Sequence, residues 1–221
     1  MASIRYELES VTRHLVENLG ESSETLFQGQ IGRAQTAGIG DAAISAGSKA
    51  PGFRLPDANE NQVGLAELLS HGPIVLVFYR GGWCPYCNIQ LRAFQKALGD
   101  IRSCGSDLVA ISPSTPDNSL ETQEREFLEF PVLSDHDCRV ARSYGLVYTV
   151  SPEARRILSD ASKNIDLHNG TRSGELPTPA TYIVDSSAVI RFCEINLDYR
   201  TRTEPETVLE VLRKLPKEKL C

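Results

Sequence analysis

Two continuous apolar runs on either side of one amphipathic segment constrain the fold of this chain more than any other feature. Residues 73–79 (PIVLVFY) and 107–113 (DLVAISP) are rich in β-branched side chains, which is typical of strands covered on both faces of a sheet. Between them, Ile89, Phe94 and Leu98 recur at roughly helical spacing. A strand, a helix and a strand in this order are most easily built as a right-handed β-α-β unit with parallel strands. The sequence therefore predicts an α/β fold.

The rest of the chain divides into a main domain and additions to it. We expect a domain over 49–215, in which 180–196 (ATYIVDSSAVIRFCEIN) forms two antiparallel strands around a Ser-Ser turn. A helical insertion near 146–178 is long enough to form a lid or wall beside a site. Residues 1–48 are predicted to be an N-terminal helical extension, and 216–221 a tail.

The N-terminal extension carries its own helical pattern. Leu8, Val11, Leu15 and Leu19 recur at steps of three and four residues, and a glycine follows them, as in an amphipathic helix with a glycine stop. A second, weaker helix is expected over 23–45. Such an extension could pack on its own domain or clasp a second subunit, so a homodimer is one possibility.

Composition and charge exclude several function classes. The 221 residues carry 23 basic and 29 acidic side chains, and basic residues gather nowhere with interleaved aromatics, so we expect no nucleic-acid partner. The N-terminus lacks the apolar core of a secretory signal, and no segment approaches the roughly 20 apolar residues of a membrane span. Six cysteines are too sparse for a secreted disulfide scaffold. We therefore expect a cytoplasmic protein without a membrane partner.

The run WCPYC carries the chemistry. It stands where the strand over 73–79 passes into a helix, and the free N–H groups at a helix start stabilise a thiolate, which is the nucleophilic form of cysteine. Cys84 and Cys87 are three positions apart and lie on one helical face, so their sulfurs can close a disulfide. Pro85 suits the first helical turn because it has no N–H to leave unpaired. This pattern predicts a redox-active dithiol.

A metal site is the main alternative for this pair, and the sequence disfavours it. A structural zinc site needs a second Cys or His pair, whereas Cys104, Cys138 and Cys193 stand alone. We interpret these three as small hydrophobic residues rather than resolving thiols, and Cys221, in the polar tail, as incidental. The run SDHD (134–137) is more simply turn and capping chemistry than a metal patch. We expect neither metal nor cofactor.

Several motifs in the same order resemble one known family. FYRGGWCPYC is similar to the active-site strand and turn of the peroxiredoxin superfamily, in the branch with a thioredoxin-style CxxC. GSKAPGFRLPD, VAISPSTPD, FPVLSD, LPTPATYIVD and DYRTRTEPE resemble further segments of that branch, and the similarity extends over 47–213. The resemblance implies a thioredoxin-like fold, with a central mixed sheet flanked by helices behind the N-terminal helical extension.

The chain departs from the main pattern of that family. Matching FYRGGWCPYC to the family motif puts Arg80 at its Pro position, Cys84 at its Thr position and Cys87 at its peroxidatic Cys position. The family's Arg, a few residues before the late strand, would fall on or near Pro179. Arg200 and Arg202 either replace this missing Arg from the C-terminal segment or pair with acidic surface residues. The side chains that in the family donate hydrogen bonds to the peroxide oxygens are therefore missing from this motif.

Features of thioredoxins complete the expected site. Thr178-Pro179 is similar to the cis-proline step that faces the CxxC of thioredoxins, so the resemblance implies a cis bond close to the sulfurs. By the same likeness, Trp83 would shield the sulfurs and shape the docking surface. Arg80 stands next to the motif and either stabilises an anion there or lies solvated in a loop.

The function implied by the resemblance is a thiol-dependent peroxidase. In this reaction a cysteine attacks a hydroperoxide, becomes a sulfenic acid and forms a Cys84–Cys87 disulfide, which thioredoxin or glutathione reduces. The alternatives are a dithiol-disulfide oxidoreductase and a non-enzymatic, redox-responsive binding module. The peroxiredoxin match makes Cys87 the sulfur that attacks peroxide, whereas thioredoxin-like reasoning favours Cys84, and we expect the peroxiredoxin order for a small peroxide.

Overall fold

A computed structural model describes residues 3–215, apart from the side chains of residues 24 and 25. The predicted tail at 216–221, with Cys221, lies outside the described residues. Within 3–215, no helix is long and apolar enough to cross a membrane.

A five-stranded mixed sheet forms the centre of the molecule. The strands run in the order β5-β4-β3-β8-β9. Strands β3, β4 and β5 are parallel, β8 pairs antiparallel with β3, and β9 pairs antiparallel with β8, so β8 alone runs against the other four. Their bounds are β3 Ile74–Phe78, β4 Asp107–Ser112, β5 Val132–Ser134, β8 Ala180–Val184 and β9 Ile190–Ile195. The predicted β-α-β unit and the predicted antiparallel pair are both confirmed.

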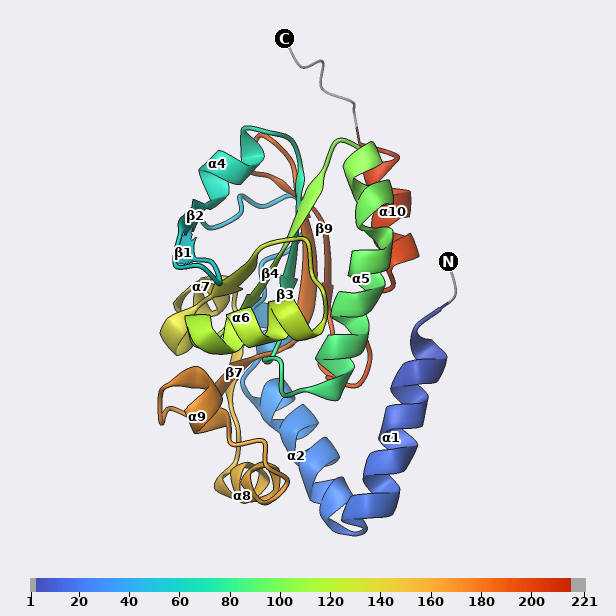
Figure 1. Ribbon diagram of the computed structural model, residues 1–221, viewed down its shortest axis with the longest axis vertical. Helices are drawn as coiled ribbons and strands as arrows, with labels where there is room; N and C mark the ends of the chain where they lie inside the picture. Colours follow the sequence, from blue (N-terminus) through green and yellow to red (C-terminus); the bar gives the residue numbers. More distant parts are fainter. Residues whose placement is uncertain (1–2, 216–221) are drawn as a thin grey trace.

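Strand β3 is buried on both faces, because helices cover the sheet from both sides. Its Val75 and Val77 pack in one apolar cluster with helices α5 (Pro85–Ser103) and α10 (Pro205–Leu212). Leu76 and Phe78 point to the opposite face, into a second cluster with helices α4 (Leu65–Leu69) and α7 (Arg139–Ser143). Figure 1 shows these helix pairs on the two sides of the sheet. The alternation of side chains along β3 therefore joins the two halves of the core.

Shorter elements complete the domain around the sheet. A hairpin of β1 (Arg54–Pro56) and β2 (Gln62–Gly64) precedes α4, and α6 (Pro116–Arg125) packs beside β5. The predicted insertion holds β6, α8, α9 and β7, and β6 and β7 pair with each other. The remaining bounds are η1 His136–Cys138, β6 Val147–Thr149, α8 Pro152–Asp160, α9 Ile165–Asn169 and β7 Glu175–Pro177.

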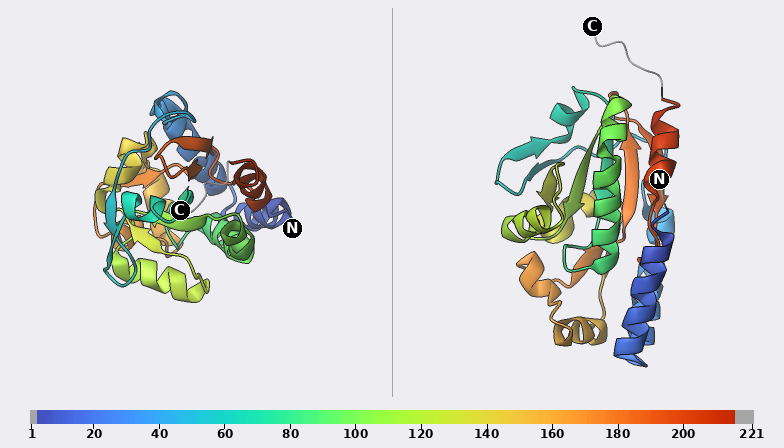
Figure 2. Two further views of the ribbon diagram at one scale, coloured as in Figure 1. Left: turned by 90° about the horizontal axis from the view of Figure 1, so that it is seen from above. Right: turned by 45° about the vertical axis from the view of Figure 1, so that its right-hand side comes forward.

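The N-terminal extension forms a V-shaped hairpin of helices α1 (Arg5–Leu19) and α2 (Ser22–Thr36), followed by the short α3 (Ile39–Ala42). The single second helix expected over 23–45 is divided, because Gly38 adopts a left-handed conformation with φ of 67°. Helix α1 packs against α5, and α2 packs against α8. Figures 1 and 2 show that the hairpin lies at the end of α5 where the CxxC stands.

The burial of β3 makes a prediction about stability. Replacing Leu76, which is fully buried, by alanine should lower the free energy of unfolding by about 2–5 kcal/mol, because it leaves a cavity in the sheet core. Leu167→Ala is the matched control, since this leucine of α9 is 76% exposed and its loss should change stability by less than about 0.5 kcal/mol. Urea denaturation of both variants measures the difference, and equal losses would contradict the fold described here.

Candidate functional site

The loop between β3 and α5 requires two glycines. Gly81 has φ of 134°, which L side chains rarely adopt, and a Cβ on Gly82 would lie 1.9 Å from the side-chain oxygen of Thr122 in α6. The carbonyl of Gly82 accepts hydrogen bonds of 2.8 Å from both Asn88 Nδ2 and Arg125 Nη2. The run RGGWC can therefore make a tight, fixed turn that carries the first cysteine to the start of α5.

Both cysteines of the CxxC lie in the first turn of α5. Cys84 is the N-cap residue and Pro85 is the first helical residue, as the sequence predicts. The carbonyl of Cys84 accepts hydrogen bonds from the backbone N–H groups of Cys87, at 3.0 Å, and Asn88, at 3.1 Å. Cys84 is 1% exposed and Cys87 is fully buried, and both are free thiols. The pair is thus removed from bulk solvent.

Arg80 is part of this site rather than a solvated loop residue. Its side chain is 1% exposed, and its Nη1 donates to Cys84 Sγ at 3.8 Å. Its Nη2 donates to Gln30 Oε1 of α2. The guanidinium also lies over the rings of Trp83, 4.8 Å from the centroid, and Tyr199, 4.0 Å from the centroid. Aromatic faces and an amide therefore take the place of water around this charge.

A second arginine approaches the other sulfur. Arg202 is 6% exposed, and its Nη2 donates to Cys87 Sγ at 3.3 Å, while its Nη1 donates to the carbonyls of Tyr199 and Thr201. Arg200, the other candidate from the C-terminal segment, instead pairs with Asp198 at 2.8 Å. In the described part of the chain neither Arg80 nor Arg202 forms an ion pair with a carboxylate.

The pKa values of the two thiols shift in opposite directions, although the charge of Arg202 lowers both. Burial opposes ionisation of Cys84, but a hydrogen bond with Cys87 and the charges of Arg80 and Arg202 hold the pKa of Cys84 well below its ordinary value. Burial raises the pKa of Cys87 well above its ordinary value, and the hydrogen bond and negative charge of Cys84 raise it further. The directions of the two shifts favour a single thiolate, on Cys84, to which the Cys87 thiol donates.

The structure adds residues to the site that the sequence analysis did not assign to it. Gln30 of α2 is 1% exposed and accepts hydrogen bonds from Arg80 and, at 3.2 Å, from the Tyr148 hydroxyl of β6. Tyr199 provides the ring under Arg80. Gln30 and Tyr148 lie far from the CxxC along the chain, and no local pattern identifies them. Tyr199 stands in DYRTRTEPE, one of the motifs that resemble the family, but only the fold shows its contact with Arg80.

The expected cis bond at Thr178-Pro179 is wrong. Both residues are buried, but every peptide bond among residues 3–215 is trans. Here Thr178 N–H donates to the Leu146 carbonyl and the Pro179 carbonyl accepts from Asn196 N–H, each at 2.8 Å, so this segment is hydrogen-bonded as it passes from β7 to β8. The likeness to a thioredoxin substrate-binding step therefore does not hold in geometry.

The remaining cysteines and the SDHD run have structural environments. Cys138 is buried, which raises the pKa of its thiol, while Cys104 and Cys193 are partly buried. The carboxylate of Asp135 accepts hydrogen bonds from the N–H groups of Val140, at 2.9 Å, and Ala141, at 2.8 Å, which confirms capping chemistry. Among residues 3–215, no group of three or more His, Cys, Asp or Glu side chains could hold a metal ion.

The site makes a prediction about pH. Thiolate absorbance in the ultraviolet should appear in the reduced protein at a pH below the ordinary thiol pKa of about 8.5, because Cys84 ionises there, and should be lost as the pH falls through the lowered pKa. Arg80→Met should move this step to higher pH by removing a buried positive charge next to the sulfur. Arg200→Met is the control, because Arg200 is paired with Asp198. An unchanged step in Arg80→Met would contradict the role of this charge.

Comparison with solved structures establishes the fold. The structure superposes on peroxidoxin BcpB of Mycobacterium tuberculosis with a TM-score of 0.62 and 21% identity, covering 79% of this chain and 99% of that protein. It superposes on AhpC of the same organism with a TM-score of 0.61 and 16% identity, covering 81% of this chain and 97% of that one. The predicted thioredoxin-like fold, with its central mixed sheet and flanking helices, is confirmed.

Sequence comparison establishes the family. The chain is 34% identical to peroxiredoxin Bcp of Escherichia coli (strain K12) over 104 residues, which is 47% of this chain and 65% of Bcp. It spans a little less than two thirds of the length of the first curated relatives it matches. The model of the AhpC/TSA family matches residues 46–193, which include the CxxC, the insertion and the sheet up to the middle of β9. The chain therefore belongs to the AhpC/TSA family.

Proposed function

We propose that this protein is a thiol-dependent peroxidase that reduces hydroperoxides through a sulfenic acid and a Cys84–Cys87 disulfide. The observation that carries the proposal is a pair of buried sulfurs at the start of α5, each of which accepts a hydrogen bond from a buried guanidinium group that lacks a carboxylate partner among residues 3–215. The lowered pKa of Cys84 provides the nucleophile, and the nearby positive charge favours the negative charge that develops on the leaving oxygen. Membership of the AhpC/TSA family supports the same reaction.

The first step forms a sulfur–oxygen bond. The Cys84 thiolate attacks one oxygen of the hydroperoxide, the O–O bond breaks, and the other oxygen leaves as an alkoxide or hydroxide that takes a proton from solvent. Cys84 is thereby oxidised to a sulfenic acid, and the hydroperoxide is reduced to an alcohol or to water. Arg80, which donates to Cys84 Sγ, is in position to stabilise the charge on the oxygen atoms.

The second step forms the disulfide. Cys87 attacks the sulfur of the sulfenic acid, hydroxide leaves, and it combines with the proton of the Cys87 thiol as water. Arg202 donates to Cys87 Sγ at 3.3 Å, so it favours the ionised form that this attack needs. Two thiols of an external reductant then reduce the Cys84–Cys87 disulfide and become a disulfide themselves. We propose thioredoxin or glutathione as that reductant, and no cofactor is needed.

This order of roles reverses the one that the peroxiredoxin match predicts. Cys84 has the lowered pKa and lines a cavity, whereas Cys87 is fully buried with a raised pKa. Membership of the AhpC/TSA family favours the peroxidase over the alternative of a dithiol-disulfide oxidoreductase. A cytoplasmic location and a homodimer remain predictions.

Single substitutions test the assignment of roles. With equimolar hydrogen peroxide, Cys87→Ser should form a sulfenic acid at Cys84 rapidly and then stop, because no resolving thiol remains. Cys84→Ser should react at least about tenfold more slowly, because the remaining Cys87 is fully buried, does not line the cavity, and has a pKa that burial raises. Dimedone labelling followed by mass spectrometry of the peptides identifies the oxidised sulfur.

The control for these variants is Cys104→Ser, which removes a thiol outside the site and should react like the native chain. Rapid sulfenic acid formation in Cys84→Ser, together with its loss in Cys87→Ser, would restore the peroxiredoxin order. Peroxide consumption that persists without either cysteine would refute the proposed function.

A further inference from the structure

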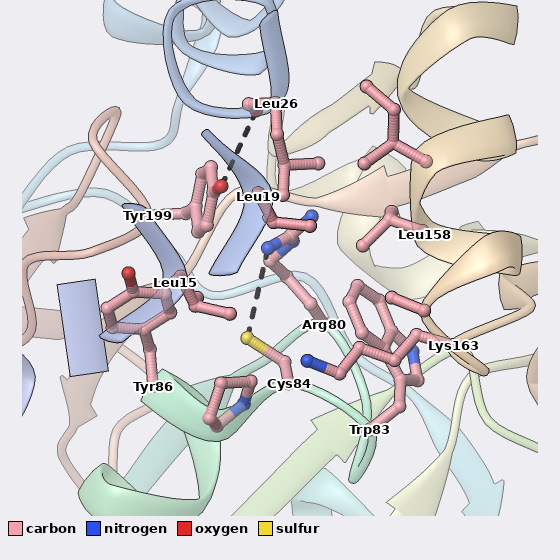
Figure 3. Close-up of a pocket in the computed structure, with 13 residues that line it drawn as sticks. Leu15, Leu19, Leu26, Arg80, Trp83, Cys84, Tyr86, Leu158, Lys163 and Tyr199 are labelled. Atoms are coloured by element: carbon pink, nitrogen blue, oxygen red, sulfur yellow. Dashed lines mark hydrogen bonds between the residues drawn. The ribbon is translucent and has the colours of Figure 1, made fainter. Parts of the chain in front are cut away.

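The sulfur of Cys84 is reached through a small and largely apolar cavity. Helices α1, α2 and α8 form the wall around this cysteine, together with Trp83 and Tyr199 from the site (Figure 3). The aliphatic side chains of that wall are Leu15, Leu19, Leu26, Ile157 and Leu158. Cys87 does not line this cavity, so a molecule that enters it meets Cys84 first.

The volume of the cavity, about 40 Å³, limits which hydroperoxides can reach the sulfur. A buried water needs about 10–15 Å³ of such space, so the cavity has room for roughly three water-sized molecules. Hydrogen peroxide fits within this space. A hydroperoxide with a bulky aromatic group, such as cumene hydroperoxide, does not fit unless the wall moves.

The leucine wall is held in place at several points. The hydroxyls of Thr12 in α1 and Tyr86 in α5 are hydrogen-bonded at 3.0 Å, and Gln30 of α2 accepts from Arg80. At the start of α1, the N–H of Ile4 donates to the carboxylate of Glu204 at 3.1 Å. The N-terminal hairpin is therefore fixed to the CxxC helix, to the site and to the C-terminal segment.

We propose that α1 and α8 form a size filter over Cys84, in which Leu19 and Leu158 are the specificity-determining residues that exclude bulky hydroperoxides. Leu19 is the last residue of α1 and Leu158 projects from α8, so the two side chains narrow the cavity from different helices (Figure 3). Truncation of either one removes atoms from the cavity wall and leaves Cys84 and both arginines in place. The inference rests on the proposed peroxidase function and adds to it the class of substrate: hydrogen peroxide and small alkyl hydroperoxides.

The experiment compares two substrates in the native chain and in Leu19→Ala and Leu158→Ala. Stopped-flow oxidation of the pre-reduced protein gives the second-order rate constant for hydrogen peroxide and for cumene hydroperoxide, and it needs no reductant that would have to enter the cavity. The native chain should prefer hydrogen peroxide over cumene hydroperoxide by about 100-fold or more, which is within the range that steric exclusion from a pocket can reach. Each variant should reduce that preference by at least about tenfold. The control is Val16→Ala, since Val16 lies on α1 but is 44% exposed and does not line the cavity.

Each outcome separates the filter from the peroxidase itself. Equal use of the two peroxides by the native chain would overturn the filter and leave the peroxidase proposal standing. A preference that stays unchanged in a folded Leu19→Ala would also overturn it, and this variant keeps the test valid if the buried Leu158→Ala fails to fold, because Leu19 is only partly buried. Consumption of neither peroxide by the native chain would refute the peroxidase and the filter together.

Discussion

Two buried guanidinium groups face two buried sulfurs at the junction of β3 and α5, and the rest of the site depends on this arrangement. Arg80 comes from the end of β3, and Arg202 comes from the segment just before α10. A buried charge without water is costly unless its hydrogen bonds and a counter-charge are supplied. A thiolate on Cys84, which the hydrogen bond from Cys87 and the charges of Arg80 and Arg202 favour, would supply that counter-charge.

The surroundings of the two arginines explain why distant segments must meet here. Gln30 and Tyr199 contact Arg80, and backbone carbonyls accept from Arg202. These partners come from the N-terminal hairpin and the C-terminal segment, which lie outside the residues that the family model matches. The N-terminal hairpin and the C-terminal segment therefore both enclose the site and contact its charged groups. They bring the amide, ring and carbonyls that a buried guanidinium needs in place of water.

The sequence was informative where local pattern controls structure. The run 73–79 predicted the central strand, and the CxxC predicted a dithiol at a helix start. Both predictions were possible because buried strands and helices have characteristic patterns of apolar residues in the sequence. Contacts between segments that are distant along the chain produce no local sequence pattern. Arg202 was one of several candidate arginines, and only the fold brings it, rather than Arg200, to Cys87. The likeness of Thr178-Pro179 to thioredoxin failed because that segment is bonded to Leu146 and Asn196 in a trans form.

The central claim is that Cys84 holds the thiolate while Cys87 stays protonated and donates to it. The most direct test is a pH titration of the ¹³Cβ resonances of both cysteines in the reduced protein by NMR spectroscopy. The Cys84 resonance should titrate below the ordinary thiol pKa of about 8.5, and the Cys87 resonance should remain that of a thiol throughout the same range. Titration of Cys87 at the lower pH, with Cys84 still protonated, would contradict the arrangement of charges described here.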